Sequence, residues 1–207
     1  MKWQGISMLH RIAQRALRGL AKFVLHSVYW VRYIGEKRLP PEGGYILCAN
    51  HRSVMDIPIA GGIGRKRWMY FMGKKELFEK PISRFFMNLM DVFPVDRGKG
   101  DLKSIKTALR HLKKGRVIII FPQGTREKEG QKLPARKGAA MLAAMSEAQI
   151  IPMYITGKMK PFSPIKVYVG KPFDLGLRKG VRYERDVYVQ KSQEIMEKIY
   201  SLPEVYD

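Results

Sequence analysis

Val117-Ile118-Ile119-Ile120-Phe121 is the segment that most strongly indicates the fold of this chain. Its β-branched and aromatic residues favour a strand. Because both faces of this strand are apolar, it belongs in the centre of a sheet that is covered on both sides. The segment before it, from Asp101 to Lys114, has apolar residues at helical spacing and is closed by Gly115. A helix followed by a fully apolar strand indicates an α/β protein.

The same alternation continues on both sides of this segment. Strands are expected at Tyr45–Ala49, Trp68–Met72, Asp91–Val95, Ile150–Ile155 and Ile165–Val169, and helices from Lys137 to about Glu147 and from Arg182 to Tyr200. These elements predict a single α/β domain with a central, mainly parallel sheet flanked by helices. The length of 207 residues fits one domain. The turn-rich segment Leu39–Gly44 separates this domain, residues 39–207, from an N-terminal region, residues 1–38.

The N-terminal region is expected to form an amphipathic basic helix. Apolar residues recur at helical spacing from Met8 to Val31, with Trp3 and Trp30 near the two ends. The interleaved basic residues are Arg11, Arg15, Arg18 and Lys22. This pattern favours a helix that lies in the interface of an anionic membrane, and the alternative is a surface helix packed on its own domain. The uncharged run Phe23–Val31 is shorter than the ~20 residues of a spanning helix, and the interleaved charges argue against a signal peptide.

The charge of the chain is strongly positive. There are 39 Lys and Arg residues against 18 Asp and Glu residues, which gives a formal net charge of +21. Such a charge favours an anionic partner: nucleic acid, anionic lipid, or an acidic carrier or cofactor. No nucleic-acid-binding signature accompanies the charge, so a nucleic-acid partner is not expected. The single cysteine, Cys48, excludes an intramolecular disulfide and fits a reducing compartment.

Three polar clusters directly follow predicted strands. They are Asn50-His51-Arg52-Ser53-Val54-Met55-Asp56, Pro94-Val95-Asp96-Arg97 and Phe121-Pro122-Gln123-Gly124-Thr125-Arg126. In an α/β sheet, ligands bind beyond the carboxyl ends of the strands, so these clusters form the candidate site. A metal site is not expected, because the four histidines are scattered and no ligand spacing recurs. A covalent nucleophile is not expected either, because Cys48 lies inside an apolar strand.

His51 and Asp56 are candidates for acid–base catalysis. On a straight helix five residues turn about 500°, which leaves the two side chains ~140° apart. A turn at His51 that leads into a helix near Asp56 brings them together, and Pro58 fits the first turn of such a helix. Asp56 would then hold one imidazole nitrogen protonated and leave the other free to accept a proton from a hydroxyl. The alternative is that Asp56 only caps the helix with Ser53, and that His51 is an ordinary turn residue.

Arg97 and Arg126 are candidates for binding a phosphate. Each follows a predicted strand, and an arginine can bind a phosphate through two parallel hydrogen bonds. Gly124 and Thr125 add backbone N–H groups and a hydroxyl to the same anion site. The alternative for each arginine is a solvated side chain. Lys74, after the second predicted strand, is a further candidate cation.

Taken together, these clusters resemble the sequence blocks of the glycerolipid acyltransferases. The first block, Asn-His-x-x-x-x-Asp, corresponds to Asn50–Asp56. It is followed by Lys-Lys-Glu-Leu at Lys74–Leu77, Phe-Pro-Val-Asp-Arg at Phe93–Arg97, Phe-Pro-Gln-Gly-Thr-Arg at Phe121–Arg126, and Ile150-Ile151-Pro152. The resemblance covers about Tyr45 to Tyr154. The His-x4-Asp pattern alone is common, and its combination with the later Phe-Pro-x-Gly-Thr-Arg makes it specific.

The resemblance implies a membrane-associated enzyme of phospholipid biosynthesis. It would move a fatty acyl group from acyl-CoA or acyl carrier protein to the 2-hydroxyl of lysophosphatidic acid, giving phosphatidic acid without an acyl-enzyme. His51, oriented by Asp56, would be the general base. The resemblance also implies that residues 39–207 are the acyltransferase domain, and that no cofactor or metal is needed beside the acyl donor. It places the enzyme on the cytoplasmic face of the membrane, with the N-terminal helix seated in the lipid.

The remaining site residues take their roles from the same resemblance. Arg97 and Arg126 would hold the phosphate of the acceptor, together with Gly124 and Thr125. Lys74 or nearby backbone amides would stabilise the oxyanion or contact the acyl donor.

The chain departs from the family pattern at three positions. Gln123 stands where the third block usually has Glu, which removes a negative charge and points to a different acceptor headgroup as an alternative. Glu127 follows Arg126 where a small polar residue is common, and it either compensates for Gln123 or pairs with a lysine. Asp91 stands where the second block often begins with Gly. Two other functions stay open: acylation of another lysolipid, such as lyso-ornithine lipid or a lysophospholipid, and non-catalytic binding to an anionic membrane.

Overall fold

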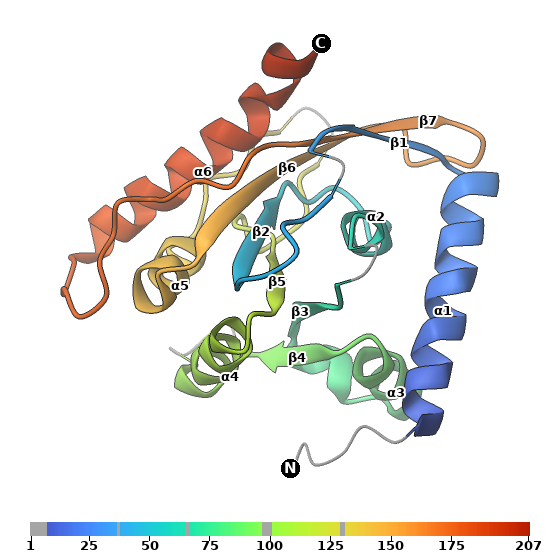
Figure 1. The fold of residues 1–207 in the computed structure, drawn as a ribbon, viewed down its shortest axis with the longest axis horizontal. Coiled ribbons are helices and arrows are strands. Elements are labelled where there is room, and N and C mark those ends of the chain that lie inside the picture. The colour runs from blue at the N-terminus through green and yellow to red at the C-terminus, as the bar shows by residue number, and fades with distance from the viewer. Residues whose placement is uncertain (1–7, 37, 65–66, 97–100, 129–130) are drawn as a thin grey trace.

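The computed structural model describes residues 8–36, 38–64, 67–96, 101–128 and 131–207. The described elements, in chain order, are α1 (Met8–Ser27), β1 (Trp30–Gly35), β2 (Tyr45–Ala49), α2 (Asp56–Gly62), β3 (Met69–Lys74), the 3-10 turn η1 (Lys75–Phe78), α3 (Pro81–Leu89), β4 (Val92–Val95), α4 (Leu102–Lys113), β5 (Val117–Ile120), α5 (Gly138–Ser146), β6 (Gln149–Gly157), β7 (Pro164–Val169) and α6 (Arg185–Tyr206). Figure 1 shows their arrangement. Trp3 and Arg97 lie outside the described residues.

The described strands form one sheet in the order β1-β7-β6-β2-β5-β3-β4. Every neighbouring pair is parallel except β6 and β7, which run antiparallel. β5 lies between β2 and β3, as its two apolar faces predicted. The mainly parallel sheet expected from the sequence is therefore confirmed. Because β2, β3, β4, β5 and β6 all run in one direction, the loops that follow them leave the sheet at the same edge.

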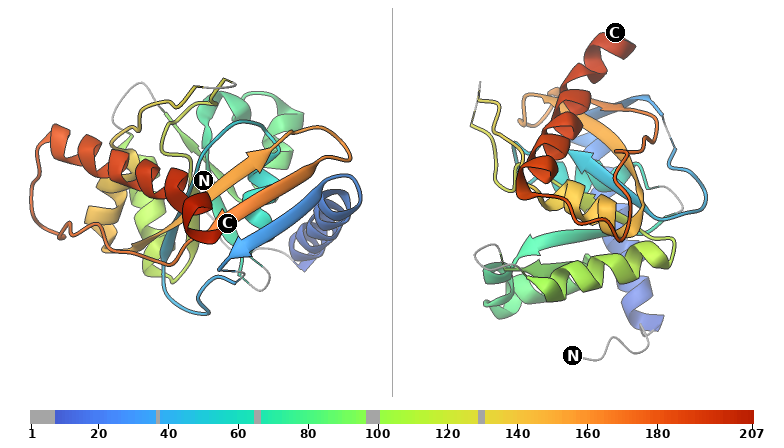
Figure 2. Two further views of the ribbon diagram at one scale, coloured as in Figure 1. Left: turned by 90° about the horizontal axis from the view of Figure 1, so that it is seen from above. Right: turned by 90° about the vertical axis from the view of Figure 1, so that its left-hand side faces the viewer.

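Helices cover both faces of this sheet (Figures 1 and 2). Successive residues of β2 point to opposite faces: Ile46 belongs to the core that includes residues of α4, α5 and α6, and Leu47 to the core on the other face. On that other face, Leu25 of α1 and Ile59 of α2 are buried. The α/β architecture therefore follows from strands that are apolar on both sides.

The N-terminal region differs from its expected form. α1 ends at Ser27, and the segment Trp30–Gly35 forms β1, which pairs in parallel with β7 at one edge of the sheet. The prediction of a helix that continues to Val31 was therefore wrong. Aromatic and β-branched residues are concentrated after Ser27, and these favour a strand once β7 offers hydrogen-bonding groups. Among the described residues, no helix is long and apolar enough to cross a membrane.

Candidate active site

Two loops meet at the carboxyl edge of the sheet. β2 and β5 are adjacent parallel strands, so residues 50–55 and residues 121–128 leave the sheet side by side. The N–H of Glu127 donates to the carbonyl oxygen of His51 over 2.7 Å, and the N–H of His51 donates to Oε1 of Gln123 over 3.0 Å. The first and third polar clusters of the sequence are therefore in direct contact.

Asn50 fixes the start of the first loop. Its side chain is fully buried, its Nδ2 donates to the carbonyl oxygen of Ile155 over 3.0 Å, and its Oδ1 accepts from the N–H of Ile155 over 2.8 Å. Ile155 lies in β6, the other neighbour of β2. The amide therefore ties the end of β2 to β6 and satisfies two buried backbone groups at once. This bond pair sets where His51 leaves the sheet.

His51 and Asp56 are in contact, as the turn-then-helix interpretation requires. α2 begins at Asp56 and has Pro58 in its first turn. The turn between β2 and α2 brings Nδ1 of His51 to 2.9 Å from Oδ2 of Asp56. An ionised carboxylate only accepts hydrogen bonds, so Nδ1 carries the hydrogen and Nε2 has a free lone pair. Nε2 makes no hydrogen bond with any residue that the structure describes.

The Asp56 carboxylate also binds the turn that precedes α2, but it does not cap the helix: α2 begins at Asp56, and its cap residue Met55 makes no side-chain cap hydrogen bond, so the capping interpretation was wrong. Oδ2 accepts from the N–H groups of Arg52 and Ser53 over 2.5 and 2.6 Å. The hydroxyl of Ser53 in turn accepts from the N–H of Met55 over 3.2 Å. Asp56 is fully buried, and among the described residues its Oδ1 has no hydrogen-bond partner. The same oxygen therefore binds the turn and orients the histidine, which fixes the carboxylate firmly against the ring.

The imidazole of His51 is held on its face as well as at its edge. It stacks on Phe121, with the ring centroids 4.1 Å apart and the planes inclined by 18°. The His51 side chain is 15% exposed, so the ring is shielded but reachable from solvent. Phe121 is the residue directly after β5, and its contact with His51 follows from the adjacency of β2 and β5.

Gln123 is buried and is the centre of a polar cluster beside His51, whose other members, Glu127 and Tyr200, are half-buried. Its Oε1 accepts from the His51 N–H, and its Nε2 donates to Oε1 of Glu127 and to the hydroxyl of Tyr200, the latter over 3.1 Å. The Tyr200 hydroxyl also donates to Glu127. Burial, followed by the bond and the charge of Glu127, raises the pKa of Tyr200 well above its ordinary value. Glu127 is therefore hydrogen-bonded to Gln123, and among the described residues it forms no ion pair with a lysine.

Three of the expected phosphate residues, Gly124, Thr125 and Arg126, lie in the loop after β5. Gly124 adopts a left-handed conformation with φ of 71°, and a Cβ added there would lie 3.0 Å from Cδ of Arg136. Thr125 and Arg126 are exposed. Lys74 is the exposed last residue of β3, at the carboxyl edge that His51 also occupies. Arg97, the other expected phosphate ligand, lies outside the described residues.

Arg136 and Tyr200 were missed by the sequence reasoning. The N–H of Arg136 donates to the carbonyl oxygen of Pro122 over 2.8 Å, and its side chain lies against Gly124. Tyr200 reaches the second loop from α6. Neither residue stands in a polar cluster after a strand, so no local signal in the sequence marks it.

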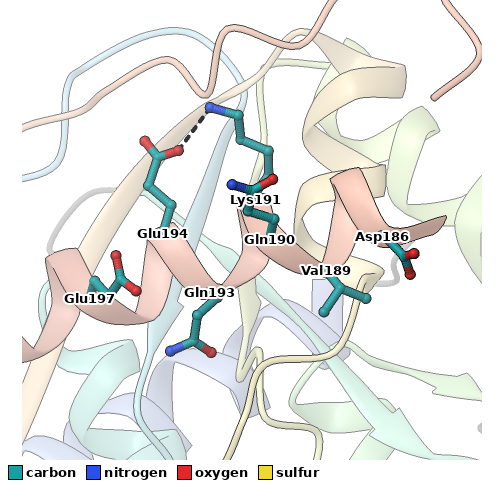
Figure 3. A pocket seen from close by; sticks show the side chains of 7 residues that line it. All are labelled: Asp186, Val189, Gln190, Lys191, Gln193, Glu194 and Glu197. Atoms are coloured by element: carbon teal, nitrogen blue, oxygen red, sulfur yellow. Dashed lines mark hydrogen bonds and ion pairs between the residues drawn. The ribbon is translucent and has the colours of Figure 1, made fainter. Parts of the chain in front are cut away.

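A surface hollow along α6 is separate from this site. Figure 3 shows its lining residues, which are Asp186, Val189, Gln190, Lys191, Gln193, Glu194 and Glu197. Lys191 and Glu194 form an ion pair of 2.8 Å there. None of the candidate site residues lines the hollow.

The family comparison identifies the class of this protein as an acyltransferase. A family model described as "Acyltransferase" matches residues 30–156, and the chain belongs to this family. It is therefore an enzyme, and the alternative of a non-catalytic membrane-binding protein is not supported.

Individual relatives within the family indicate a narrower class of acyltransferase. Over 157 residues the chain is 31% identical to the 1-acyl-sn-glycerol-3-phosphate acyltransferase of Bacillus subtilis, covering 73% of this chain and 77% of that protein. It is 34% identical over 146 residues to the protein of the same name from Streptococcus pneumoniae, covering 69% of this chain and 54% of that protein. The streptococcal match therefore spans about half of that relative. The crystal structure of the 1-acyl-sn-glycerophosphate acyltransferase of Thermotoga maritima shares the fold, with a TM-score of 0.67, 21% identity, and coverage of 97% of this chain and 83% of that one.

Proposed function

We propose that this enzyme transfers a fatty acyl group from a thioester to the 2-hydroxyl of lysophosphatidic acid and so forms phosphatidic acid. The observation that carries the proposal is the 2.9 Å contact between Nδ1 of His51 and the buried carboxylate of Asp56. The choice of acceptor is supported by the names of the Bacillus and Streptococcus relatives, which are 1-acyl-sn-glycerol-3-phosphate acyltransferases.

His51 is the general base of the proposed reaction. Nδ1 donates to Asp56, so Nε2 accepts the proton of the acceptor hydroxyl as the hydroxyl oxygen attacks the thioester carbonyl carbon. The imidazolium that forms is stabilised by the carboxylate beside it. Asp56 cannot turn away, because the N–H groups of Arg52 and Ser53 hold its oxygen in place.

The attack produces a tetrahedral intermediate whose oxygen carries a negative charge. Collapse of this intermediate forms the new ester bond and breaks the carbon–sulfur bond. The departing thiolate takes the proton from Nε2 of His51, which returns the base to its starting state. Acyl-CoA or acyl carrier protein supplies the thioester as a co-substrate, and the proposed reaction requires no cofactor or metal.

Cationic groups at the carboxyl edge serve the charged parts of the substrates. Arg126, with Gly124 and Thr125 in the same loop, is proposed to bind the phosphate of the acceptor, with Arg97 as a second ligand. Lys74 is proposed to stabilise the oxyanion or to contact the acyl donor, because the strand that carries it neighbours β5. The anionic acceptor and donor both match the net charge of +21.

The proposed acceptor resides in a membrane, so the enzyme is proposed to act as a peripheral or monotopic protein on the cytoplasmic face. α1 is the proposed contact with the anionic surface. It combines exposed apolar side chains such as Ile12 and Phe23 with a segment of sequence that is rich in arginine and lysine.

The direct test is release of free thiol from palmitoyl-CoA by the purified protein with detergent-dispersed lysophosphatidic acid. Carrier-bound donor is run in parallel, because the two donors present the same thioester on different carriers. We expect acceptor-dependent release, and a kcat about 10²–10⁴-fold lower for His51→Ala with an unchanged circular dichroism spectrum. Absence of acceptor-dependent release with either donor would overturn the choice of lysophosphatidic acid.

The Gln123–Glu127 pair supports a second acceptor class for the same chemistry. The family pattern usually has Glu at the position of Gln123. With an amide at position 123 and a carboxylate at position 127, the negative charge next to the proposed phosphate residues is placed differently from that pattern. The assay is therefore repeated with lyso-ornithine lipid and with lysophospholipids that have phosphodiester headgroups. A higher kcat/KM for one of these than for lysophosphatidic acid would assign that acceptor, while His51 keeps the same role.

A further inference from the structure

α3 presents an apolar face to solvent. Ile82, Phe85 and Phe86 are 75%, 62% and 46% exposed, and their spacing places them on one side of the helix. The rings of Phe85 and Phe86 meet edge to face with centroids 5.6 Å apart. Leu89 is buried and anchors the end of the same helix against the domain. Large apolar side chains gathered on one exposed helix face are unusual for a surface that meets only water.

α3 lies beside α1, which has an exposed apolar face of its own. The two helices are neighbours in Figure 1. The Gln14 side chain of α1 donates to the carbonyl oxygen of Leu89, over 3.2 Å, at the end of α3. Gln14 and Leu25 are buried on the domain side of α1. The exposed apolar residues of α1 are Met8, Ile12, Leu20 and Phe23, and a turn of 100° per residue places them on the side opposite Gln14 and Leu25. α1 therefore uses one side to hold the domain and leaves the other unpartnered among the described residues.

The charges around these helices indicate what covers the apolar faces. Sequence positions 1–35 contain basic residues and no Asp or Glu. The exposed charged residues just before and within α3 are the basic Lys74, Lys75, Lys80 and Arg84 and the acidic Glu76 and Glu79, which leaves a net positive charge. Exposed aromatic and aliphatic side chains among basic ones fit the headgroup and upper acyl region of an anionic bilayer.

We propose that α3 is a second membrane-contact element, and that Ile82, Phe85 and Phe86 insert into the interface of an anionic lipid bilayer beside α1. The inference rests on the proposed function, because a lysolipid acceptor is supplied from a membrane. The chain leaves the carboxyl edge of the sheet at Lys74 and enters α3 through the single turn η1. Contact through α3 thus brings the lipid surface toward the edge where His51 lies.

The test measures partitioning of purified protein onto vesicles of phosphatidylethanolamine and phosphatidylglycerol that contain no lysolipid. We expect the double variant Ile82→Ser with Phe85→Ser to bind about a hundredfold more weakly, because each large apolar side chain contributes a factor of about ten on burial. The matched control is Val181→Ser with Val205→Ser. These valines are 51% and 69% exposed, and Val205 lies on α6, which packs on the other face of the sheet from α1. The control should bind as the wild type does.

A second measurement reports insertion directly. Cys48 is fully buried, so a cysteine introduced at position 85 can be labelled alone in the folded protein. An environment-sensitive dye on Phe85→Cys should shift to shorter wavelength when the vesicles are added. The same dye on Val205→Cys should not shift.

Two outcomes would overturn the inference. One is unchanged vesicle binding by the α3 double variant together with no spectral shift at position 85, which would leave α1 as the membrane contact. The other is a wild-type dimer in sedimentation experiments that the α3 variant dissociates, which would assign the face to a second copy of the chain. Vesicle binding requires no turnover, so His51→Ala should keep full vesicle binding. A failure of the proposed function would therefore leave the result of this test unchanged.

Discussion

The loop after β2 and the loop after β5 lie side by side, yet they are held in place by different kinds of contact. Residues 50–55 are followed directly by Asp56, whose carboxylate bonds to His51, Arg52 and Ser53, all within five positions along the chain. In residues 121–128, Gln123 depends on Tyr200, which α6 supplies from far along the sequence. The side chain of His51 is therefore oriented by a nearby residue, although Asn50 ties the start of this loop to β6, whereas the second loop is supported by a distant helix.

The two loops also carry different proposed roles, which are proton transfer in the first and phosphate binding in the second. The proposed base is oriented by Asp56, which lies five positions along the chain. The proposed phosphate residues Gly124, Thr125 and Arg126 sit in the loop that α6 supports. We therefore expect changes in the first loop to act most strongly on turnover and stability, and changes in the second to have smaller effects.

Asp56→Asn should produce the largest effect. The amide offers a weaker acceptor to Nδ1 of His51, so kcat should fall about 10²–10⁴-fold in the thiol-release assay. The matched control is Asp101→Asn, because Asp101 accepts from the N–H groups of Lys103, Ser104 and Asp96 and so makes a similar set of backbone bonds away from His51. An equal loss of kcat in both variants, at a similar Tm, would contradict a specific role of Asp56.

Asn50→Ala should lower the free energy of unfolding by about 2–4 kcal/mol, because it leaves the buried N–H and C=O of Ile155 without the bonds they make now. Urea denaturation followed by circular dichroism measures this change. Asn88→Ala is the control, since the Asn88 side chain makes no hydrogen bond with the described residues, and a change within about 0.5 kcal/mol is expected there. A small loss at Asn50 would show that strand pairing alone holds the end of β2.

Gln123→Glu should destabilise the second loop by about 1–3 kcal/mol at pH 8, because it places a carboxylate beside Glu127 and removes two donated bonds. The neighbouring charge raises the folded-state pKa of the introduced carboxyl group. The loss should therefore be smaller at low pH and grow as pH rises through that raised pKa.

The double variant Gln123→Glu with Glu127→Gln tests whether these two side chains stabilise the loop as a pair. It keeps one carboxylate and one amide, so most of the stability should return. Additive losses in the double variant would show that the two side chains do not act as a pair.

Tyr200→Phe should have the smallest effect, a loss of about 1 kcal/mol in stability and a reduction of kcat within about tenfold. The variant removes the hydroxyl that bonds to Gln123 and Glu127 but keeps the packed ring. The Tyr200 pKa is raised in the folded protein, so this stabilisation is complete below the ordinary tyrosine pKa of about 10 and is lost as pH rises above it. Equal stability of variant and wild type at pH 7 would show that the Tyr200 hydroxyl of α6 does not stabilise the second loop.

The elements that the sequence predicted well are those whose own residues suffice to form them. β2 begins and ends at the expected residues, and β5 lies inside the sheet as its apolar faces require. The predicted helix wrongly extended to Val31, into the first two residues of β1, because an edge strand such as Trp30–Gly35 is defined by its partner β7. α3 was not predicted, because only Leu89 of that short helix is buried and its main apolar side chains point outward.

The parts of the candidate site that the sequence predicted are likewise those held by residues close together in the chain. The spacing of His51, Asp56 and Pro58 was enough to predict a turn followed by a helix start, since hydrogen bonds within five residues close at little cost in chain entropy. The order of the strands in the sheet, and the contacts of His51 with Phe121 and Gln123, came only from the tertiary structure. Bonds between distant residues such as Gln123 and Tyr200 form only after the sheet and its covering helices have packed, so no local pattern encodes them.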